Sequence, residues 1–569
     1  MGSIAGAIYP NELPEESATR RMLAHSPCVS HVWSEYRTEL GKATPHPHIL
    51  VSPSDWIVLV DGSIVNQAEI NSEILKHNRP LPHQTIEESI ASLYSIHQEN
   101  AFTFLNGNFA LALYDRPKQE LLLVRDRLGE KGLYWILKNN QFLFANSLKS
   151  LLLSRLVSQT PDLEALSFYI SFGYIPQEKS PIQNVFKLQP GHYLKVTKEK
   201  NLLIRPYWSY NSLLKRKRTE IGPKDLSSMA SKVFNRRISS SNDLPVCLVQ
   251  SDKEKTLLRR EWGTTLKFIS HDVQLSAQNV LDDLFSMIWQ LDEPVADIAL
   301  PNFWRTCKEL KVKGQTELFF STGSLSHLTH EIYPPRVFRL KPLSYLERLL
   351  KEKMLIPLAY QFHPRSAYEM LRSIHTHPWH LAFLQQTALF DKKEFYDLRS
   401  QLLQPVDDEI FLHRFPALEK LGPTISSLLY LYHKIKLPPS ILLPQERFCS
   451  HFGIVKKAPY LDKEMVELIA AIPDHSSRFS YDRIFTQTNP RVCPLPPWTI
   501  GITTQKLTDK LSKSVLVEAG LFSRQWLSEQ MKNFNRHPNL FFQELWGLLV
   551  LEVWFRLYIE GDIADVGLS

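Results

Sequence analysis

Alternating charges in residues 251–256 mark one place where the chain could bind a phosphate. The segment follows an apolar run of strand length, 246–249. Lys253 and Lys255 could hold an anion as point charges, but Asp252 and Glu254 oppose an anion there. We therefore interpret the segment as an exposed, charged turn.

Histidines suggest two weaker candidates, both for metal binding. His327 and His330 are three residues apart and precede Glu331, and a second pair flanks a proline at His46 and His48. Zinc sites need three or four ligands at recognisable spacing, and no further ligand can be identified here. We assign no metal site from the sequence.

Cysteine usage and the apolar segments bear on the compartment. The five cysteines are dispersed without a CxxC pair, so neither a disulfide framework nor a zinc site is predicted. The N-terminus lacks the pattern of a signal peptide. The apolar stretch 540–559 contains Glu544, Glu552 and Arg556, which disfavour a membrane span. We expect a cytoplasmic protein with no membrane partner.

The overall charge gives little reason to expect nucleic acid as a partner. The net charge is +7, from 66 basic and 59 acidic residues scattered along the chain. One compact basic run, 215–218, is interpreted as a solvated linker.

Strand signals dominate the first third of the chain. Residues 56–60 predict a strand that enters a turn at Asp61-Gly62 and resumes at 63–65. Helical periodicity covers 86–96. Apolar runs typical of buried strands follow at 109–114, 121–124, 134–136 and 142–145. This pattern predicts a layered α+β domain.

The 569-residue length requires at least two domains. We predict a first domain at 1–210, a linker at 211–224 and a second domain at 225–569. Strands at 245–249 and 318–320, separated by helical patterns, indicate a parallel α/β sheet. From residue 340 onwards helices are expected, interrupted by prolines such as Pro438-Pro439.

Several motifs, in order along most of the chain, resemble landmarks of the glutamine-dependent asparagine synthetase family. The most specific is the RDRLGEKGLY stretch at 125–134. The others are FLNGNFALALYD at 104–115, LQPGHY at 188–193 with Tyr207-Trp208, LDEPVAD at 291–297, PYLD at 459–462, and the region from Leu545-Trp546 to Trp554-Phe555.

The resemblance implies an N-terminal glutamine amidotransferase type 2-like domain with the α+β sandwich of the N-terminal-nucleophile (Ntn) hydrolases. It implies a second domain with an α/β fold like that of the ATP pyrophosphatases (adenine nucleotide alpha hydrolases) and a helical C-terminal part. The family releases ammonia from glutamine and adenylates aspartate. ATP and Mg²⁺ are expected as cofactors only if that activity is retained.

The residues at the implied glutaminase site depart from the family pattern. Gly2 stands where the family has its nucleophilic cysteine, and Ser3 is one position too late to replace it. Asp61 replaces an asparagine that would donate to the oxyanion, and an ionised carboxylate only accepts. Gly62 could still offer its backbone N–H. Two substrate-binding acidic residues are replaced, by Ser63 and Ile86.

The implied nucleotide site is altered as well. The family's SGGxDS loop falls on 251–256, where charged side chains replace both glycines and hinder close approach of the backbone to phosphate. The family's SGEGGDE element falls on 321–327, which offers no carboxylate for Mg²⁺. The equivalent positions are Ser251, Asp252, Lys253, Lys255, Thr256, Ser321 and Thr322.

Two further family elements are only partly retained. KVDR falls on 444–447, which keeps Arg447, and LEVR falls on 454–457, which loses its glutamate.

These replacements favour a non-catalytic homologue of asparagine synthetase with a binding, scaffolding or regulatory role. One alternative is an active asparagine synthetase, or a related ATP-dependent amide-forming ligase, with altered site residues. A further alternative is a homodimer, or a heterodimer with an active paralogue.

Overall fold

The computed structural model describes the chain in a series of ranges. These are 3–10, 13–24, 26, 28, 30–43, 50–51, 55–79, 85–176, 178–214, 223–237, 246–249, 267–270, 275–322, 402–404, 406, 429–471, 498–499, 511, 513–536 and 538–562.

The N-terminal half contains two antiparallel sheets, each of six strands within these ranges. The first sheet has the order β10-β8-β9-β1-β3-β2. Its strands are β1 (Ser3–Ile8), β2 (Ser30–Glu35), β3 (Thr38–Ala43), β8 (Tyr134–Lys138), β9 (Gln141–Ala145) and β10 (Phe186–Lys187).

The second sheet has the order β12-β11-β7-β6-β5-β4. Its strands are β4 (Leu50–Val51), β5 (Trp56–Ile64), β6 (Gly107–Asp115), β7 (Glu120–Arg125), β11 (His192–Val196) and β12 (Leu202–Pro206).

A buried apolar layer lies between the two sheets. The first sheet contributes Ile4, Leu40 and Phe144, and the second contributes Leu59 and Leu123. Successive side chains of a strand point to opposite faces, so the other face of each sheet needs its own cover.

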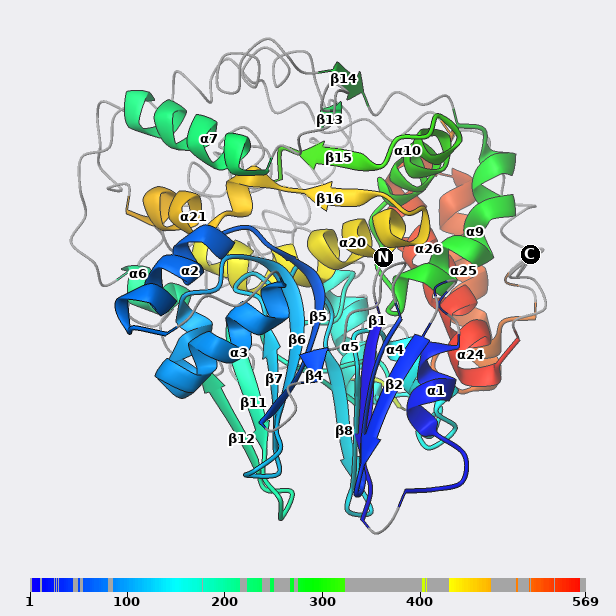
Figure 1. Ribbon diagram of the computed structural model, residues 1–569. Coiled ribbons are helices and arrows are strands. Elements are labelled where there is room, and N and C mark those ends of the chain that lie inside the picture. Colours follow the sequence, from blue (N-terminus) through cyan, green and yellow to red (C-terminus); the bar gives the residue numbers. More distant parts are fainter. Residues whose placement is uncertain are drawn as a thin grey trace.

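Helices cover both outer faces (Figure 1). Helices α2 (Gln67–Lys76) and α3 (Ile86–His97) pack through Ile74 and Leu93 onto Leu111 of the second sheet. Helices α1 (Ala18–Leu23) and α4 (Leu148–Leu153) cover the first sheet. The helix–sheet–sheet–helix order confirms the expected layered α+β domain.

One local prediction was wrong: Asp61-Gly62 is not a turn. Strand β5 continues through both residues, and Gly62 pairs with Phe109 of β6. Gly62 has φ +115°, a conformation that glycine adopts readily. Glycine therefore distorts the strand here without ending it.

Within the described residues, the second half contains a parallel sheet of four strands, in the order β14-β13-β15-β16. Its strands are β13 (Val246–Val249), β14 (Lys267–Ser270), β15 (Glu317–Phe320) and β16 (Val455–Lys457). Both strands that the sequence predicted are present, and their parallel pairing confirms the expected α/β arrangement.

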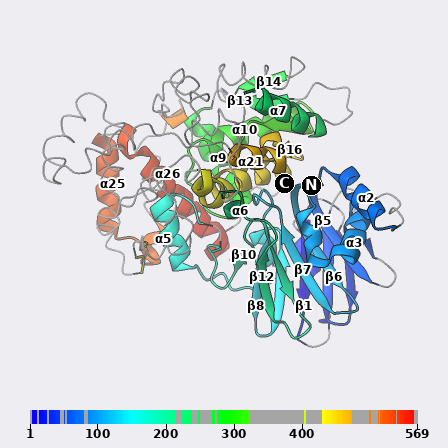
Figure 2. The same ribbon diagram turned by 90° about the vertical axis from the view of Figure 1, so that its left-hand side faces the viewer.

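Helices of the second half pack around this sheet or to one side of it. They are α7 (Pro223–Arg237), α9 (Ala277–Leu291), α10 (Leu300–Val312), α20 (Leu443–His451), α21 (Lys463–Ala470), α24 (Val515–Glu518), α25 (Arg524–Arg536) and α26 (Pro538–Phe555). Of these, α24, α25 and α26 lie to one side of the sheet, beside α9 (Figures 1 and 2). Among the helices in the described ranges, none is long and apolar enough to cross a membrane.

The prolines at 438–439 do not interrupt the helix as expected. Two π-helical turns, η5 (Tyr432–Lys436) and η6 (Pro438–Leu442), lead directly into α20. A π turn changes the local hydrogen-bond pattern, so the chain can pass two prolines without leaving the helical path.

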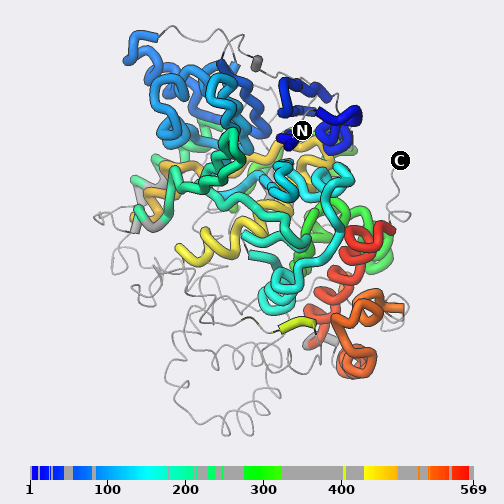
Figure 3. The backbone as a smooth tube through the Cα atoms, turned by 90° about the horizontal axis from the view of Figure 1, so that it is seen from below, coloured from blue at the N-terminus to red at the C-terminus, as the bar shows by residue number. Residues whose placement is uncertain are grey.

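Residues from both halves share one hydrophobic core. Helix α5 (Leu163–Phe172) leaves the sandwich and lies beside α26, as Figures 2 and 3 show. The Tyr169 hydroxyl donates to the Gly547 carbonyl at 2.8 Å, and the indole of Trp554 donates to the Asp292 carbonyl at 2.9 Å. The segment predicted as a linker, 211–224, starts inside α6 (Tyr210–Leu214) and ends inside α7.

Candidate functional site at the junction of the two halves

The RDRLGEKGLY stretch forms a tightly bonded loop where the two halves meet. The buried Arg125 guanidinium donates to the carbonyls of Lys131 (2.7 Å), Leu188 (2.7 Å) and Gly129 (3.0 Å). Gly129 has φ +71°, which allows the sharp turn. The loop therefore keeps a fixed shape, because one side chain bonds three backbone groups.

Asp126 stabilises the same loop from its inner side. Its carboxylate accepts the backbone N–H groups of Glu130 (3.0 Å) and Lys131 (2.9 Å). Burial and the charge of Glu130 raise the pKa of Asp126 to about 6. Glu130 and Lys131 are consequently held at defined positions, and both reach the second half.

Lys131 lies between two buried carboxylates. Its Nζ is 3.3 Å from Asp61 and forms a short contact with Glu446 of α20. Burial opposes the charge on Lys131, but the attraction of Asp61 and Glu446 outweighs it and raises the pKa of Lys131. The same ion pair lowers the pKa of Glu446 despite its burial.

Asp61 is fully engaged in this network. Its side chain is 2% exposed, and its second oxygen accepts a hydrogen bond from the Asn146 amide at 2.8 Å. A carboxylate held by an ammonium and an amide is an acceptor group. It offers no donor to an oxyanion at this position.

A second buried ion pair joins the loop to the parallel sheet. Glu130 lies 3.3 Å from Lys456, which is on β16, and both side chains are buried. Residues 130 and 131 thus contact two different elements of the second half, β16 and α20.

The LDEPVAD motif takes part in the junction through both of its acidic residues. Asp292 pairs with Arg447 at 2.7 Å and accepts the Leu148 N–H at the start of α4 at 3.1 Å. Glu293 pairs with Lys187 at 2.7 Å and accepts the Tyr134 hydroxyl at 2.9 Å. Both carboxylates are therefore occupied by ion pairs and hydrogen bonds to other residues of the protein, and these contacts hold the two halves together.

The PYLD motif makes the same kind of contact. Asp462 caps α21 and accepts the Asn106 amide of the sandwich at 3.1 Å. Arg236 of α7 lies 3.3 Å from the same carboxylate. Four of the motifs that carry the family resemblance therefore meet at this junction: RDRLGEKGLY, LDEPVAD, PYLD and, through Asn106, FLNGNFALALYD.

The other residues predicted for the glutamine pocket are not part of the Lys131 network. Gly62 and Ser63 are exposed at the end of β5. Ile86 is half-buried and packs against the core under α3. Gly2 lies outside the described residues, and the role of the Gly62 N–H stays a prediction.

Ser321 and Thr322 follow β15, whose carboxyl end lies at the same edge as that of the parallel strand β13. The Thr322 hydroxyl donates to Gln445 Oε1 at 3.4 Å and accepts from Gln445 Nε2 at 3.3 Å. Both Ser321 and Thr322 are buried. The remaining predicted positions, Ser251, Asp252, Lys253, Lys255 and Thr256, lie outside the described residues, as do His46, His48, His327 and His330.

Sequence reasoning missed Lys131 and Asn146 as partners of Asp61. Lys131 lies in a recognised family motif, and Glu446 lies in the segment equivalent to KVDR, so the sequence marked both residues. It did not indicate that they form an ion pair, because 315 residues separate them in the chain.

Two family models match the chain, one in each half. The glutamine amidotransferase domain matches residues 39–208, and the asparagine synthase model matches residues 246–479. The fold, and the family motifs that meet at the junction of its two halves, thus define a protein with an amidotransferase domain followed by an asparagine synthase domain.

Individual relatives agree. Asparagine synthetase (glutamine-hydrolysing) 1 of Bacillus subtilis is 22% identical over 450 residues, 74% of this chain and 70% of the relative. Asparagine synthetase (glutamine-hydrolysing) 3 of the same organism is 24% identical over 43% of this chain and 42% of the relative. The chain belongs to the asparagine synthetase-like family.

A solved structure titled as the allosteric regulatory enzyme of purine biosynthesis also aligns. It covers 47% of this chain and 64% of its own, with 10% identity and a TM-score of 0.27. That similarity is too low to bear on the fold.

Proposed function

We propose that this protein is a non-catalytic member of the family, retained for binding, scaffolding or regulation. We assign the N-terminal sandwich to the Ntn-hydrolase fold and the parallel sheet to the ATP-pyrophosphatase fold. The observation that carries the proposal is the Asp61–Lys131–Glu446 network, in which a site position of the first domain is bonded into the second domain.

Electrostatics at Asp61 support the loss of glutaminase chemistry. Hydrolysis of an amide develops negative charge on the carbonyl oxygen, and preorganised donors must stabilise it. A carboxylate at this position would repel that charge. Losing one oxyanion donor typically costs about 10²–10³ in kcat, and Gly2 supplies no nucleophilic side chain in addition.

The nucleotide side supports the same proposal. Mg²⁺ bound to ATP prefers carboxylate ligands, whereas Ser321 and Thr322 supply hydroxyl groups, one of them bonded to Gln445. The charged sequence of 251–256 stands where the family has a glycine-containing phosphate loop. Each change weakens a different contact to the nucleotide.

A cytoplasmic location is part of the proposal. The described cysteines, Cys28, Cys247, Cys307 and Cys449, are free thiols, and the buried thiols of Cys307 and Cys449 contact each other. Two adjacent reduced thiols suit a reducing compartment.

Two assays test the proposal on the full chain, each with an active glutamine-dependent asparagine synthetase as positive control. Calorimetric titration with ATP and Mg²⁺ should show no binding, and incubation with glutamine should release no glutamate above the buffer rate. Micromolar ATP binding or catalytic glutamate release would overturn the corresponding half of the proposal.

If ATP does bind, a double variant and a control variant test whether the lysines of residues 251–256 contact its phosphates. Lys253→Ala with Lys255→Ala removes the two candidate phosphate contacts, and Lys313→Ala at the end of α10 is the matched control. ATP binding that is lost in the double variant but kept in Lys313→Ala would favour the alternative of an active ligase.

A further inference from the structure

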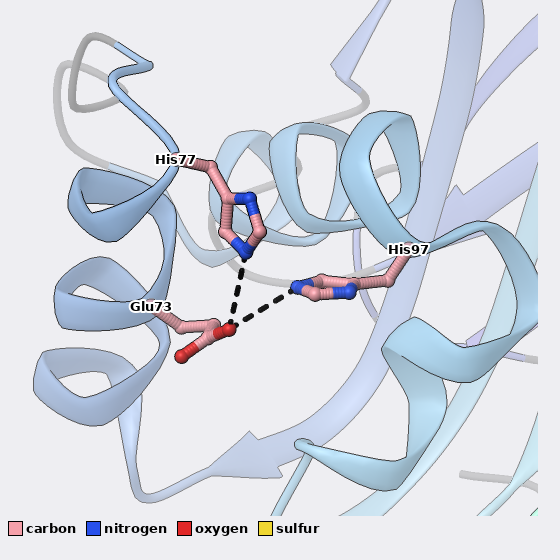
Figure 4. Close-up of side chains that lie close together, drawn as sticks. All are labelled: Glu73, His77 and His97. Atoms are coloured by element: carbon pink, nitrogen blue, oxygen red, sulfur yellow. Dashed lines mark ion pairs between the residues drawn. The ribbon is translucent and has the colours of Figure 1, made fainter.

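Three side chains on the outer helices of the sandwich converge on one point. Glu73 and His77 are four residues apart at the end of α2, and His97 is the last residue of α3. The Glu73 Oε1 lies 3.4 Å from His77 Nε2 and 3.3 Å from His97 Nε2 (Figure 4). All three ligand atoms lie within 4.8 Å of one another.

The two separations from Glu73 Oε1 match the edges of a tetrahedral zinc site. Zinc binds imidazole nitrogen and carboxylate oxygen at about 2.0–2.2 Å, which places neighbouring tetrahedral ligands about 3.3 Å apart and octahedral ligands about 2.9 Å apart. Both measured edges agree with the tetrahedral value. They are longer than the 2.7–2.9 Å typical of a charge-assisted hydrogen bond.

The surroundings of the three residues favour a cation. Both α2 and α3 end at the cluster, and the C-terminus of a helix carries partial negative charge. His97 Nε2 is buried and has no hydrogen-bond partner among the described residues. A bound metal ion would satisfy this nitrogen directly.

Partial exposure leaves room for an ion to enter. The side chains of Glu73, His77 and His97 are 17%, 45% and 20% exposed. Lys76 lies 3.1 Å from the other Glu73 oxygen, Oε2, and is 71% exposed. It therefore leaves Oε1 free for the metal, although its charge weakens the attraction of the cluster for a cation.

We propose that Glu73, His77 and His97 bind one Zn²⁺ ion, with a water molecule as the fourth ligand. The ion would join the end of α2 to the end of α3. The helices also meet through apolar packing onto the sheet, as Ile74 and Leu93 do, and through hydrogen bonds of Ser89 with Asn71 and Gln67. The site lies on the outer layer, apart from the Lys131 network, so the proposal does not depend on the proposed function.

Titration of the chelator-treated full chain with Co²⁺ and Zn²⁺ tests the site. We expect one equivalent of Co²⁺ to give the intense visible absorption of tetrahedral cobalt, and one equivalent of Zn²⁺ to abolish it. Zinc should also raise the melting temperature, because a ligand that binds only the folded state stabilises it.

The variants His97→Gln and Glu73→Gln should lose this absorption and bind zinc at least about 100-fold more weakly, since loss of even an outer-shell partner costs about 10–100-fold. His31→Gln is the matched control, because His31 is exposed on β2. Glu73→Gln alters a partly exposed side chain and so guards against a folding defect.

Absence of tetrahedral cobalt absorption in the unaltered chain would overturn the proposal. Equal zinc affinity in His97→Gln, Glu73→Gln and His31→Gln would also overturn it, because the ion would then be held by other residues.

Discussion

At the scale of single residues, Lys131 decides what Asp61 can do. The Lys131 ammonium forms ion pairs with both Asp61 and Glu446, and it keeps the pKa of the buried Glu446 carboxyl below its ordinary value. Buried ion pairs of this kind add little net stability, but breaking one leaves an uncompensated charge. Asp61, which stands where the family has an asparagine that donates to the oxyanion, is therefore part of a structural network of ion pairs.

Replacing Lys131 by methionine should lower the free energy of unfolding by about 3–5 kcal/mol at neutral pH, because two buried carboxylates lose their partner. The triple variant Lys131→Met, Asp61→Asn, Glu446→Gln should recover much of this loss. Urea unfolding measures both. A single variant as stable as the unaltered chain would contradict the assigned role.

The stability of the unaltered chain and that of the Lys131→Met variant should change in opposite directions as the pH falls. In the unaltered chain the lowered pKa of Glu446 gives stability that is present above the ordinary value of 4.5 and is lost as the pH falls through the lowered value. In Lys131→Met the Glu446 carboxyl loses the cation that lowers its pKa, so burial raises that pKa and the variant gains stability as the pH falls from about 7 to about 5.

At the scale of elements, glycines allow β5 and β6 to approach closely. A Cβ at Gly62 would lie 2.0 Å from the Asn108 carbonyl oxygen, and one at Gly107 would lie 2.0 Å from the Ser63 carbonyl oxygen. Both glycines have positive φ. The end of β5, which carries Asp61, depends on this close approach.

Gly62→Ala should destabilise the chain by about 3 kcal/mol or more, because backbone strain of about 1–3 kcal/mol adds to a clash with backbone atoms. Gly314→Ala is the matched control: its φ is +71°, but a Cβ there meets nothing within 4 Å. Thermal unfolding of the two variants separates the clash from the φ penalty. Equal losses would contradict the packing argument.

At the scale of the whole molecule, the two domains are joined by buried polar contacts and a shared apolar core. Arg447 is central, because it bonds Asp292 at 2.7 Å and the Asn146 carbonyl at 2.6 Å. Interfaces this polar are sensitive to the loss of one partner. The domains should therefore unfold together.

Calorimetry should give a single transition for the unaltered chain. Arg447→Met leaves Asp292 buried without its cationic partner, so we expect a loss of about 3–5 kcal/mol and separation into two transitions. Arg305→Met, which removes only a surface pair with Glu309 at 3.4 Å, is the control. Two transitions in the unaltered chain would contradict the coupling.

Much of the fold could be predicted because apolar periodicity is local. Strands β6, β7, β8 and β9 and helix α3 lie where their patterns indicated. The exceptions are Asp61-Gly62 and Pro438-Pro439, where turn-forming residues lie inside regular elements. There the tertiary pairing of β5 with β6, and a π turn before α20, outweigh local preference.

The sequence by itself determined the family, the order of the two domains and the replacement of residues such as Gly2 and Asp61. These are properties of residue type and order. Only the tertiary structure decided that Lys131 bridges Asp61 to Glu446, that Asp292 and Asp462 bind the opposite domain, and that His97 meets Glu73. Such contacts depend on how segments far apart in the sequence pack together, and the spacing of residues along the chain does not indicate how close they lie in space.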